Sequence, residues 1–449
     1  MCGYRSGDVQ PTQRIGIVAG AALVTLAPYL FFRLVHDTLT AQWIVLAALW
    51  IFLFTEAGIR QISMYAALIA LSMFVHPYFV PMSLAFAGGS MMRNLYAARG
   101  GFSRRLVLRE LVASSVCYLA VIGLSVLVLG LWRIKNVGAQ VGVHSMDPLA
   151  WFNSMGNSQI LSGWTVGSGQ HEGFQYLGLG VIAALVFSLA ALAMKKAVMS
   201  ERLRASLPWL AIILSILFLA AVSPIVTVFG TTVIDTGIQN VPLIGKVLEA
   251  FRSSGRLFWP ASYLTAIFAV VVLLSARKRW STWLVVGCLA VQVIDIKPMA
   301  DDVRRQTSPE FVQPILKFPD VWKELLRDTS EIVFAPADFP YSHKRRFYEL
   351  MTLALPLGAS SNLMYTAQGI TARTSAESKR DLRALLEEAS KGGRLLVIQE
   401  SAAIGIICPP QASIEKNGFH LLDGVVVKPA APPGDVPGLA IWRCPAGDG

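Results

Sequence analysis

Long apolar stretches without a charged residue constrain this sequence most. The chain of 449 residues is 54% hydrophobic and 15% charged, whereas soluble proteins carry about a quarter charged residues. A helix rises about 1.5 Å per residue and needs roughly 20 apolar residues to cross a ~30 Å hydrocarbon core. Because unpaired backbone amides are costly in lipid, such segments must be helical. We therefore expect membrane-spanning helices at Leu111–Leu131, Leu177–Met194, Leu207–Val222 and Leu257–Leu274.

The positive charge of the chain is unevenly distributed. Residues 1–295 hold 21 Lys and Arg against 10 Asp and Glu, while residues 296–449 hold 18 of each. The excess gathers in short segments between apolar runs, at Arg93–Arg109, Lys195–Arg204 and Arg277–Arg279. This pattern is typical of cytoplasmic loops and disfavours nucleic acid as a partner.

An even number of crossings separates each basic cluster from the next, so all three can share the cytoplasmic side. The segments Trp132–Tyr176, Gly230–Arg256 and everything after Asp295 are then external. We expect a multi-pass protein of the bacterial inner membrane, with its C-terminal domain in the periplasm or outside the cell.

The N-terminal third admits two topologies. After apolar segments at Ile15–Phe32 and Trp43–Ala57, the segment Ile62–Ala87 is interrupted by His76-Pro77. Read as one kinked helix, it places the N-terminus outside, and proline is tolerated in membrane helices. We favour a hairpin that turns at His76-Pro77, because proline lacks an amide donor and biases its predecessor away from helix. The hairpin gives about nine membrane segments within a transmembrane domain of residues 1–295.

Residues 296–449 are expected to form a separate soluble α/β domain. The run Phe311–Arg327 has helical spacing, and Glu331–Pro336 and Arg394–Gln399 are short apolar strands. The segment Thr374–Ser390 predicts a capped amphipathic helix that ends at a glycine pair.

The five cysteines show no metal-binding spacing. Cys117 and Cys288 fall in hydrophobic segments, where cysteine acts as a small apolar residue. Cys408 and Cys444 both lie in the C-terminal domain and would pair if that domain faces an oxidising compartment. The sequence leaves this pairing open, since it cannot supply the geometry.

Polar residues beside membrane segments are candidates for function because they are costly there. Two guanidiniums at a membrane surface suit a lipid-linked phosphate, although arginines and aromatic residues at helix ends also contact headgroups. A carboxylate in an external loop can act as a general base or help to hold a divalent cation, although most are ordinary loop residues. Isolated histidines are more often surface residues. The candidates are Asp37 and Glu172 as catalytic carboxylates, and Arg33, His36, His76, Gln170, Arg252, Ser254 and Arg256 as substrate-binding residues.

Several strings resemble an uncharacterised family of bacterial polytopic membrane proteins, which is itself similar to the GT-C glycosyltransferases. The resemblance covers roughly residues 30–300. The strings are Arg33-x-x-His36-Asp37, His76-Pro77-Tyr78, Gly169-Gln170-x-Glu172-Gly173-Phe174-x-Tyr176 and Phe251-Arg252-x-Ser254-Gly255-Arg256-x-Phe258-Trp259-Pro260.

This resemblance implies a GT-C-like helical body and transfer of a sugar from a polyprenyl-phosphate donor on the outer face of the membrane. Its implied partners are a lipid-linked sugar and membrane lipids. GT-C enzymes usually carry an acidic pair in their first external loop, whereas residues 33–42 contain only Asp37. The departure predicts either a missing N-terminal portion or a divergent, inactive member. The alternatives are a transporter or lipid-handling protein, and a scaffold of an envelope-polysaccharide complex.

Overall fold

The chain forms two compact units, Met1–Thr307 and Ser308–Gly449. The computed structural model describes residues 11–34, 36–97, 104–129, 141–242, 244–245, 248, 253–308, 314–336, 339–362, 393–408, 418–430 and 438–444. The boundary falls later than the expected one at residue 295, because helix α12 (Lys297–Gln306) continues from the last apolar helix and contacts α2 (Pro28–Phe31).

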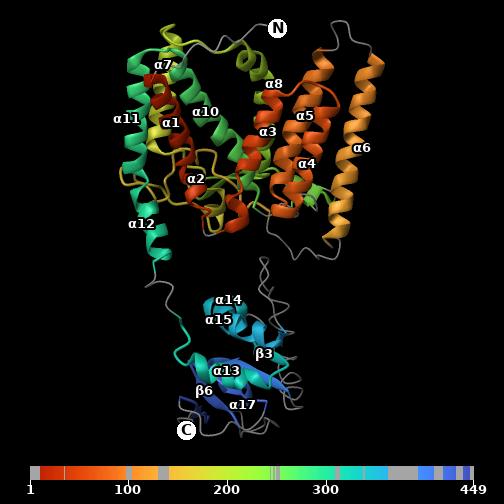
Figure 1. The fold of residues 1–449 in the computed structure, drawn as a ribbon, viewed down its shortest axis with the longest axis vertical. Helices are drawn as coiled ribbons and strands as arrows, with labels where there is room; N and C mark the ends of the chain where they lie inside the picture. The colour runs from red at the N-terminus through yellow and green to blue at the C-terminus, as the bar shows by residue number, and fades with distance from the viewer. Residues whose placement is uncertain are drawn as a thin grey trace. The chain divides into compact units, whose positions relative to one another are not determined.

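The first unit is an assembly of apolar helices in two groups (Figure 1). One group packs α1, α7, α10 and α11 together, the other packs α3, α4, α5 and α6, and α8 contacts both. The helices are α1 (Pro11–Thr25), α3 (Trp43–Phe54), α4 (Ile59–Val75), α5 (Phe79–Ala97), α6 (Arg104–Val128), α7 (Leu179–Ala193), α8 (Glu201–Val222), α10 (Trp259–Ser275) and α11 (Arg279–Asp295).

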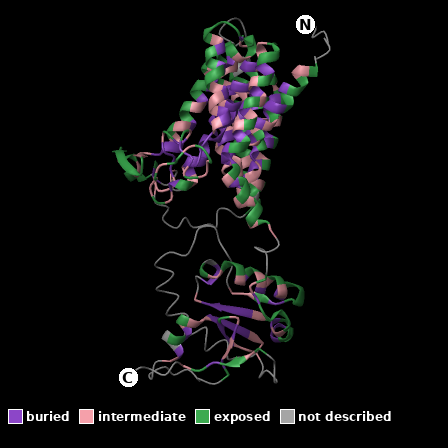
Figure 2. Cartoon of the chain, turned by 90° about the vertical axis from the view of Figure 1, so that its left-hand side faces the viewer, coloured by how far each residue is buried: buried purple, intermediate pink, exposed green. Residues whose placement is uncertain are grey.

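Shorter elements lie between these helices. They are the 3-10 turns η1 (Asp37–Thr40), η4 (Gln170–Gly173), η5 (Ile238–Asn240) and η6 (Ser254–Phe258), and the antiparallel strands β1 (Ile225–Val228) and β2 (Thr231–Asp235). The β1–β2 hairpin projects from the helices, and every residue of β2 is exposed (Figure 2).

Helices α4 and α5 form the hairpin that the sequence favoured. Helix α4 ends at Val75, and His76 takes an extended conformation before Pro77. Three side-chain hydrogen bonds then join the two helices in antiparallel register, between Tyr65 and Ser90, between Gln61 and Asn94, and between Ser72 and Ser83. The single kinked helix is therefore wrong.

The expected count of nine membrane segments is not supported. Among the described residues, three helices are long and apolar enough to cross a membrane: Leu108–Val128, Glu201–Val222 and Ser254–Ser275. The bent pair α11 and α12 raises the number to four at most. The stretch Leu177–Met194 was expected to span but yields only the 15-residue α7, about 22 Å long at 1.5 Å per residue. Its first apolar residues belong to a turn that Gly178 makes with a φ of 86°.

Three basic segments share one end of this unit. Arg93 on α5 donates to the Phe52 carbonyl of α3 at 2.7 Å, and Arg202 on α8 lies over the Phe54 ring. The Val198 amide donates to Ser275 Oγ at the end of α10. The loops that carry the three basic clusters therefore lie near one another, as a common membrane side requires. We call this the basic end.

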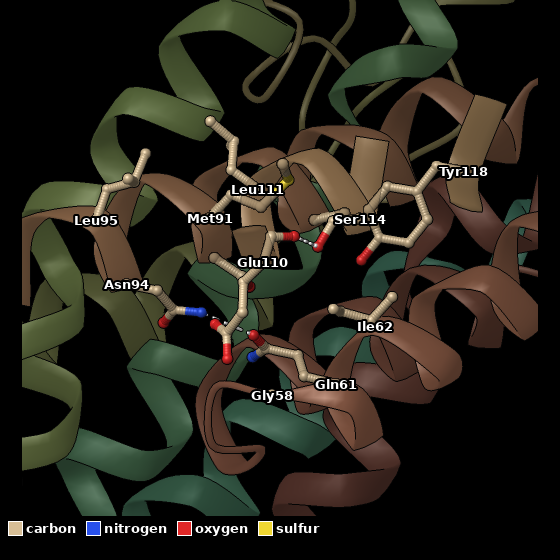
Figure 3. A pocket seen from close by; sticks show the side chains of 12 residues that line it. Gly58, Gln61, Ile62, Met91, Asn94, Leu95, Glu110, Leu111, Ser114 and Tyr118 are labelled. Atoms are coloured by element: carbon tan, nitrogen blue, oxygen red, sulfur yellow. Dashed lines mark hydrogen bonds between the residues drawn. The ribbon is translucent and has the colours of Figure 1, made fainter. Parts of the chain in front are cut away.

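A small pocket lies between α4, α5 and α6 (Figure 3). Its volume is about 20 Å³, room for about one water molecule. Asn94 Nδ2 donates to Gln61 Oε1 across it at 3.1 Å. The pocket is a packing gap between helices, and none of the candidate functional residues lines it.

The second unit contains a six-stranded mixed sheet in the order β4-β3-β5-β7-β6-β8. Strand β3 pairs in parallel with β4 and β5, while β7, β6 and β8 add in antiparallel fashion. The strands are β3 (Glu331–Ala335), β4 (Ser360–Ser361), β5 (Arg394–Gln399), β6 (His420–Leu422), β7 (Val425–Lys428) and β8 (Ala440–Ile441). The expected strands at 331–336 and 394–399 are thus confirmed.

The central strands β3, β5 and β7 are buried (Figure 2), and because alternate side chains point to opposite faces, both faces of the sheet are covered there. Ile332 and Phe334 belong to the buried cluster on one face, and Val333 and Ala335 to the cluster on the other. The helices are α13 (Pro319–Arg327), α14 (Phe339–Ser342), α15 (Lys344–Ala354), followed by the turn η7 (Leu355–Leu357), and α17 (Glu400–Ile407). The helix expected at Thr374–Ser390 lies outside the described residues.

Cys408 and Cys444 form a disulfide across a sequence separation of 36, with Cα atoms 5.5 Å apart. The bond ties the end of α17 to the chain after β8, beside the buried Phe419 and Trp442. The pairing that the sequence left open is therefore present.

Reduction should release two thiols per chain and lower the stability of the second unit by roughly 2–4 kcal/mol. Mass tagging with a maleimide in denaturant, before and after reduction, measures the first effect. A variant that carries both Cys408→Ser and Cys444→Ser is the control, and its tagging should be the same before and after reduction. Equal tagging of the wild type would contradict the disulfide.

Candidate functional site

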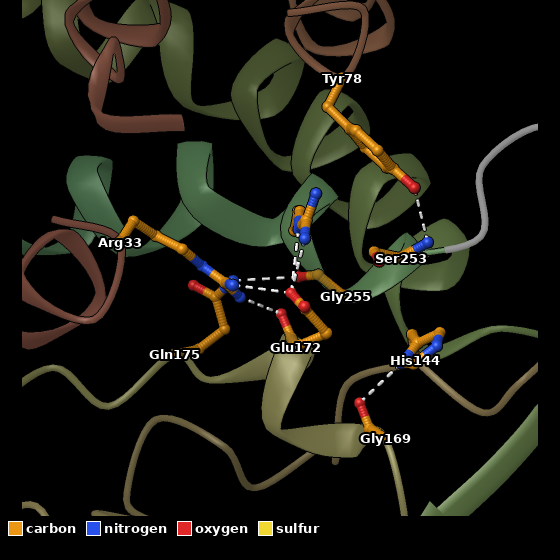
Figure 4. A network of polar contacts seen from close by, with 9 residues as sticks. Arg33, Tyr78, His144, Gly169, Glu172, Gln175, Ser253 and Gly255 are labelled. Atoms are coloured by element: carbon orange, nitrogen blue, oxygen red, sulfur yellow. Dashed lines mark hydrogen bonds and ion pairs between the residues drawn. The ribbon is translucent and has the colours of Figure 1, made fainter. Parts of the chain in front are cut away.

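Three segments that are far apart in sequence bring Arg33, Glu172 and Arg256 together (Figure 4). Arg33 follows α2, Glu172 lies in η4 and Arg256 in η6. Glu172 Oε2 accepts from Arg33 Nη1 at 2.6 Å and from Arg256 Nη2 at 2.7 Å and Nε at 3.2 Å. Arg33 Nη2 also donates to the main-chain carbonyl of Glu172 at 2.6 Å. We call these three residues the guanidinium–carboxylate cluster.

Aromatic rings support both guanidiniums. Arg33 lies over the rings of Phe32 and Trp259, at 5.0 and 6.0 Å from their centroids. Arg256 lies 4.9 Å from the centroid of Tyr78, and the Tyr78 hydroxyl accepts from the Ser253 amide at 2.6 Å. These contacts attract a cation to the ring face and hold both side chains at fixed positions.

The turn that carries Glu172 is anchored on both sides. Gly169 precedes η4 with a φ of 84°, a conformation that side chains rarely adopt. Gln170 is buried, where its Oε1 accepts from the Gly167 amide at 2.7 Å and its Nε2 donates to Thr227 Oγ1 of β1. Gln170 therefore fixes the turn from within and does not reach the cluster as a ligand-binding group.

The turns η4 and η6 touch through two glycines. A Cβ atom at Gly255 would lie 2.5 Å from the Cα atom of Gly173, which is backbone and cannot yield. Gln175 then donates to the Gly255 carbonyl at 3.0 Å and accepts from Ser262 Oγ at 2.8 Å. This close approach sets the distance between Glu172 and Arg256.

Asp295 anchors the far end of the same loop. Its buried carboxylate accepts from the Tyr176 hydroxyl at 2.8 Å, from the Leu179 amide at 2.9 Å and from the Ser158 hydroxyl. It thereby caps the start of α7 and holds the loop against the end of α11. Asp295 was not among the candidates from the sequence, because it is the last residue of an apolar segment.

The electrostatics of the cluster favour the charged form of Glu172. Burial alone would raise its pKa, but the charges and hydrogen bonds of Arg33 and Arg256 hold the pKa at about 2. Burial lowers the pKa of Arg33 to about 10 in spite of the neighbouring Glu172, and the charge of Arg256 acts in the same direction. Glu172 is consequently ionised at every physiological pH and is too weak a base for easy proton abstraction.

His76 lies beside the cluster. Burial first, and then the charges of Arg256 and His36, lower the pKa of His76 to about 4. Its Nδ1 accepts from the Tyr78 amide at 3.3 Å, so a neutral His76 shapes the turn between α4 and α5. His36 is exposed and precedes η1.

Three candidates remain. Ser254 makes a contact within the fold, and the side chains of Arg252 and Asp37 lie outside the described residues. Ser254 Oγ donates to the Ala221 carbonyl at the end of α8, 3.3 Å away. Arg252 lies outside the described residues, as does the side chain of Asp37, whose backbone begins η1. Of the candidate arginines, Arg33 and Arg256 are the two that the described residues bring together, through Glu172.

Three further residues beside the cluster were not among the site candidates from the sequence. Tyr78, Gln175 and His144 all contact the turns of the cluster, His144 through its Nδ1, 2.9 Å from the Gly169 carbonyl oxygen. Tyr78 directly follows His76-Pro77, and this position in a hairpin turn was a usable signal. Within the described residues, no group of three or more His, Cys, Asp or Glu is placed to hold a metal ion.

Gly255→Ala should lower the free energy of unfolding by about 1–3 kcal/mol, because the added methyl group meets backbone that cannot move away. Gly287→Ala is the matched control, since a Cβ atom there meets nothing within 4 Å in α11. It should be neutral or gain up to about 1 kcal/mol. Thermal unfolding in lipid nanodiscs measures both, and equal stability of the two variants would refute the close approach of η4 and η6.

The pH dependence of stability should report on Glu172. Its folded pKa of about 2 lies below the ordinary 4.5, so its contribution is complete above pH 4.5 and is lost as the pH falls toward 2. The stability difference between wild type and Glu172→Gln should be constant above about pH 5 and shrink below 4.5. Chemical unfolding at a series of pH values measures it. A difference that shrinks with rising pH would contradict the assigned ion pairing.

Comparison with known families places the chain. No curated protein and no solved structure matches it. The family model described as a domain of unknown function, DUF6311, matches residues 6–297. This match spans well over half of the 449 residues and includes every residue of the guanidinium–carboxylate cluster. The chain belongs to the DUF6311 family.

Proposed function

We propose that this protein is a membrane glycosyltransferase, similar in plan to the GT-C enzymes, that takes a sugar from a polyprenyl-phosphate-linked donor. The observation that carries the proposal is the meeting of two buried guanidiniums, Arg33 and Arg256, at one end of an apolar helical unit. Charged groups at such a position are costly and commonly serve function.

Charge and geometry favour a phosphate group as the ligand. Two guanidiniums against one carboxylate leave the cluster with one net positive charge. Guanidinium groups donate in a planar fork that matches phosphate oxygens. Held by Phe32, Trp259 and Tyr78, they are oriented before any ligand binds, which lowers the cost of binding.

In the proposed reaction an acceptor hydroxyl attacks the anomeric carbon of the donor sugar. A new glycosidic C–O bond forms, the bond to the lipid phosphate breaks, and a carboxylate takes the hydroxyl proton. Arg33 and Arg256 stabilise the charge that develops on the leaving phosphate. Asp37 remains the candidate for the base, while Glu172 is ion-paired with the two guanidiniums.

The proposed location follows from the two ends of the helical unit. The basic end belongs in the cytoplasm by the excess of Lys and Arg in its loops. The guanidinium–carboxylate cluster, at the opposite ends of α4 and α10, then faces the periplasm or cell exterior. The Cys408–Cys444 disulfide supports an oxidising compartment for the second unit.

A second candidate is a lipid-handling protein that binds the same phosphate without transfer. The observation that favours it is the ion pairing of Glu172 with both arginines, which weakens that carboxylate as a base. Such a protein would bind a polyprenyl phosphate but release no free lipid phosphate from a sugar-charged donor.

Turnover of a polyprenyl-phosphate-linked sugar by the full chain in nanodiscs, with and without a divalent cation, tests the proposal. Arg33→Ala and Arg256→Ala should each reduce turnover by roughly 100-fold or more, as the loss of a charge-stabilising donor does. Arg60→Ala, an exposed arginine near the start of α4, is the control and should retain activity. Equal turnover in all three variants, or donor binding with no turnover by the wild type, would reject the transferase.

A further inference from the structure

The side chain of Glu172 has the position that a ligand phosphate would need. Its Oε2 alone accepts three N–H groups, one from Arg33 and two from Arg256. A phosphate group offers three oxygens to the same donors and can satisfy two planar guanidiniums better than one carboxylate oxygen does.

The two guanidiniums do not depend on the Glu172 side chain for their positions. Arg33 is held by the main-chain carbonyl of Glu172 at 2.6 Å and by two aromatic rings. Arg256 is held over Tyr78. Departure of the carboxylate would therefore leave both donors in place, facing a shared vacant position.

Arg33 also has a donor without a partner. Its Nε is buried and makes no hydrogen bond, although leaving a buried charged donor unsatisfied is destabilising. The donors of Arg33 are therefore only partly satisfied in this structure.

Exposure places Glu172 on the solvent side of the cluster. Its side chain is 18% exposed, against 3% for Arg33 and 9% for Arg256. The Glu172 side chain is thus the most exposed of the three, so a ligand that arrives from solvent can reach it before the two arginines.

We propose that Glu172 is an internal occupant of an anion site formed by Arg33 and Arg256, and that an incoming phosphate group displaces its side chain. The identity of the ligand as a phosphate group rests on the proposed function. The exchange itself rests on the geometry of Arg33, Glu172 and Arg256. The exchange makes binding selective, because a ligand must carry enough negative charge to compete with a tethered carboxylate.

The test measures binding of inorganic phosphate to the full chain in nanodiscs by titration calorimetry. Glu172→Gln removes the competing charge but keeps a hydrogen-bond acceptor of the same shape, so it should bind phosphate roughly tenfold or more tightly than wild type. Adding Arg256→Ala should abolish the gain. Glu201→Gln, an exposed carboxylate at the start of α8, is the control and should leave phosphate affinity unchanged.

Unchanged or weaker phosphate binding by a folded Glu172→Gln variant would overturn the proposal. If thermal unfolding shows that this variant does not fold, Glu172→Asp decides. The shorter aspartate side chain should reach the guanidiniums poorly, so the Glu172→Asp variant should bind phosphate more tightly than wild type. An unchanged phosphate affinity of this variant would overturn the exchange.

Competition by polyprenyl phosphate in the nanodisc distinguishes a lipid headgroup from a soluble anion as the natural ligand. If polyprenyl phosphate competes with inorganic phosphate, the exchange takes place with a lipid-borne phosphate. If phosphate binds tightly and polyprenyl phosphate does not compete, the exchange takes place with a soluble anion. Tightened phosphate binding without any sugar transfer would sustain the exchange while rejecting the transferase. Sugar transfer without tighter phosphate binding by Glu172→Gln would sustain the transferase while rejecting the exchange.

Discussion

The ion pairing of one carboxylate with two buried guanidiniums constrains the whole helical unit. A buried charge that loses its partner costs roughly 3–5 kcal/mol, so the two guanidiniums need an anion between them, which in this structure is the carboxylate of Glu172. The three residues come from the end of α2, from η4 and from η6. The two salt bridges hold these loop segments against the helix ends. The aromatic rings of Phe32 and Tyr78 then decide where each guanidinium lies.

The loop that carries Glu172 is ordered by polar side chains within the protein. Gln170 reaches β1, Gln175 reaches η6, and Asp295 binds Tyr176 at the start of α7. Each of these buried groups is satisfied by a partner from a different element, as buried polar groups generally are. A long loop at the end of apolar helices thereby becomes rigid enough to position a carboxylate within hydrogen-bond distance of two cations.

The sequence predicted features that depend on local chemistry and missed those that depend on distant partners. The hairpin at His76-Pro77 followed from proline, and the strands predicted at Glu331–Pro336 and Arg394–Gln399 followed from short apolar runs. The span at Leu177–Met194 failed because hydropathy does not register the turn at Gly178. Glu172 and Arg256 were found as candidates, but their mutual pairing could not be, since 84 residues separate them. In the structure the Glu172 carboxylate is ion-paired with both arginines, which lowers its pKa and weakens it as a base.

A double-mutant cycle between Glu172 and Arg256 tests most directly whether the cluster acts as one unit. The free energy of unfolding is measured in nanodiscs for wild type, Glu172→Gln, Arg256→Gln and the double variant. Residues in direct contact couple by about 0.5–3 kcal/mol, and the burial of this pair predicts a value in the upper half of that range. Additive effects of the two substitutions would contradict the pairing on which the account of the site depends.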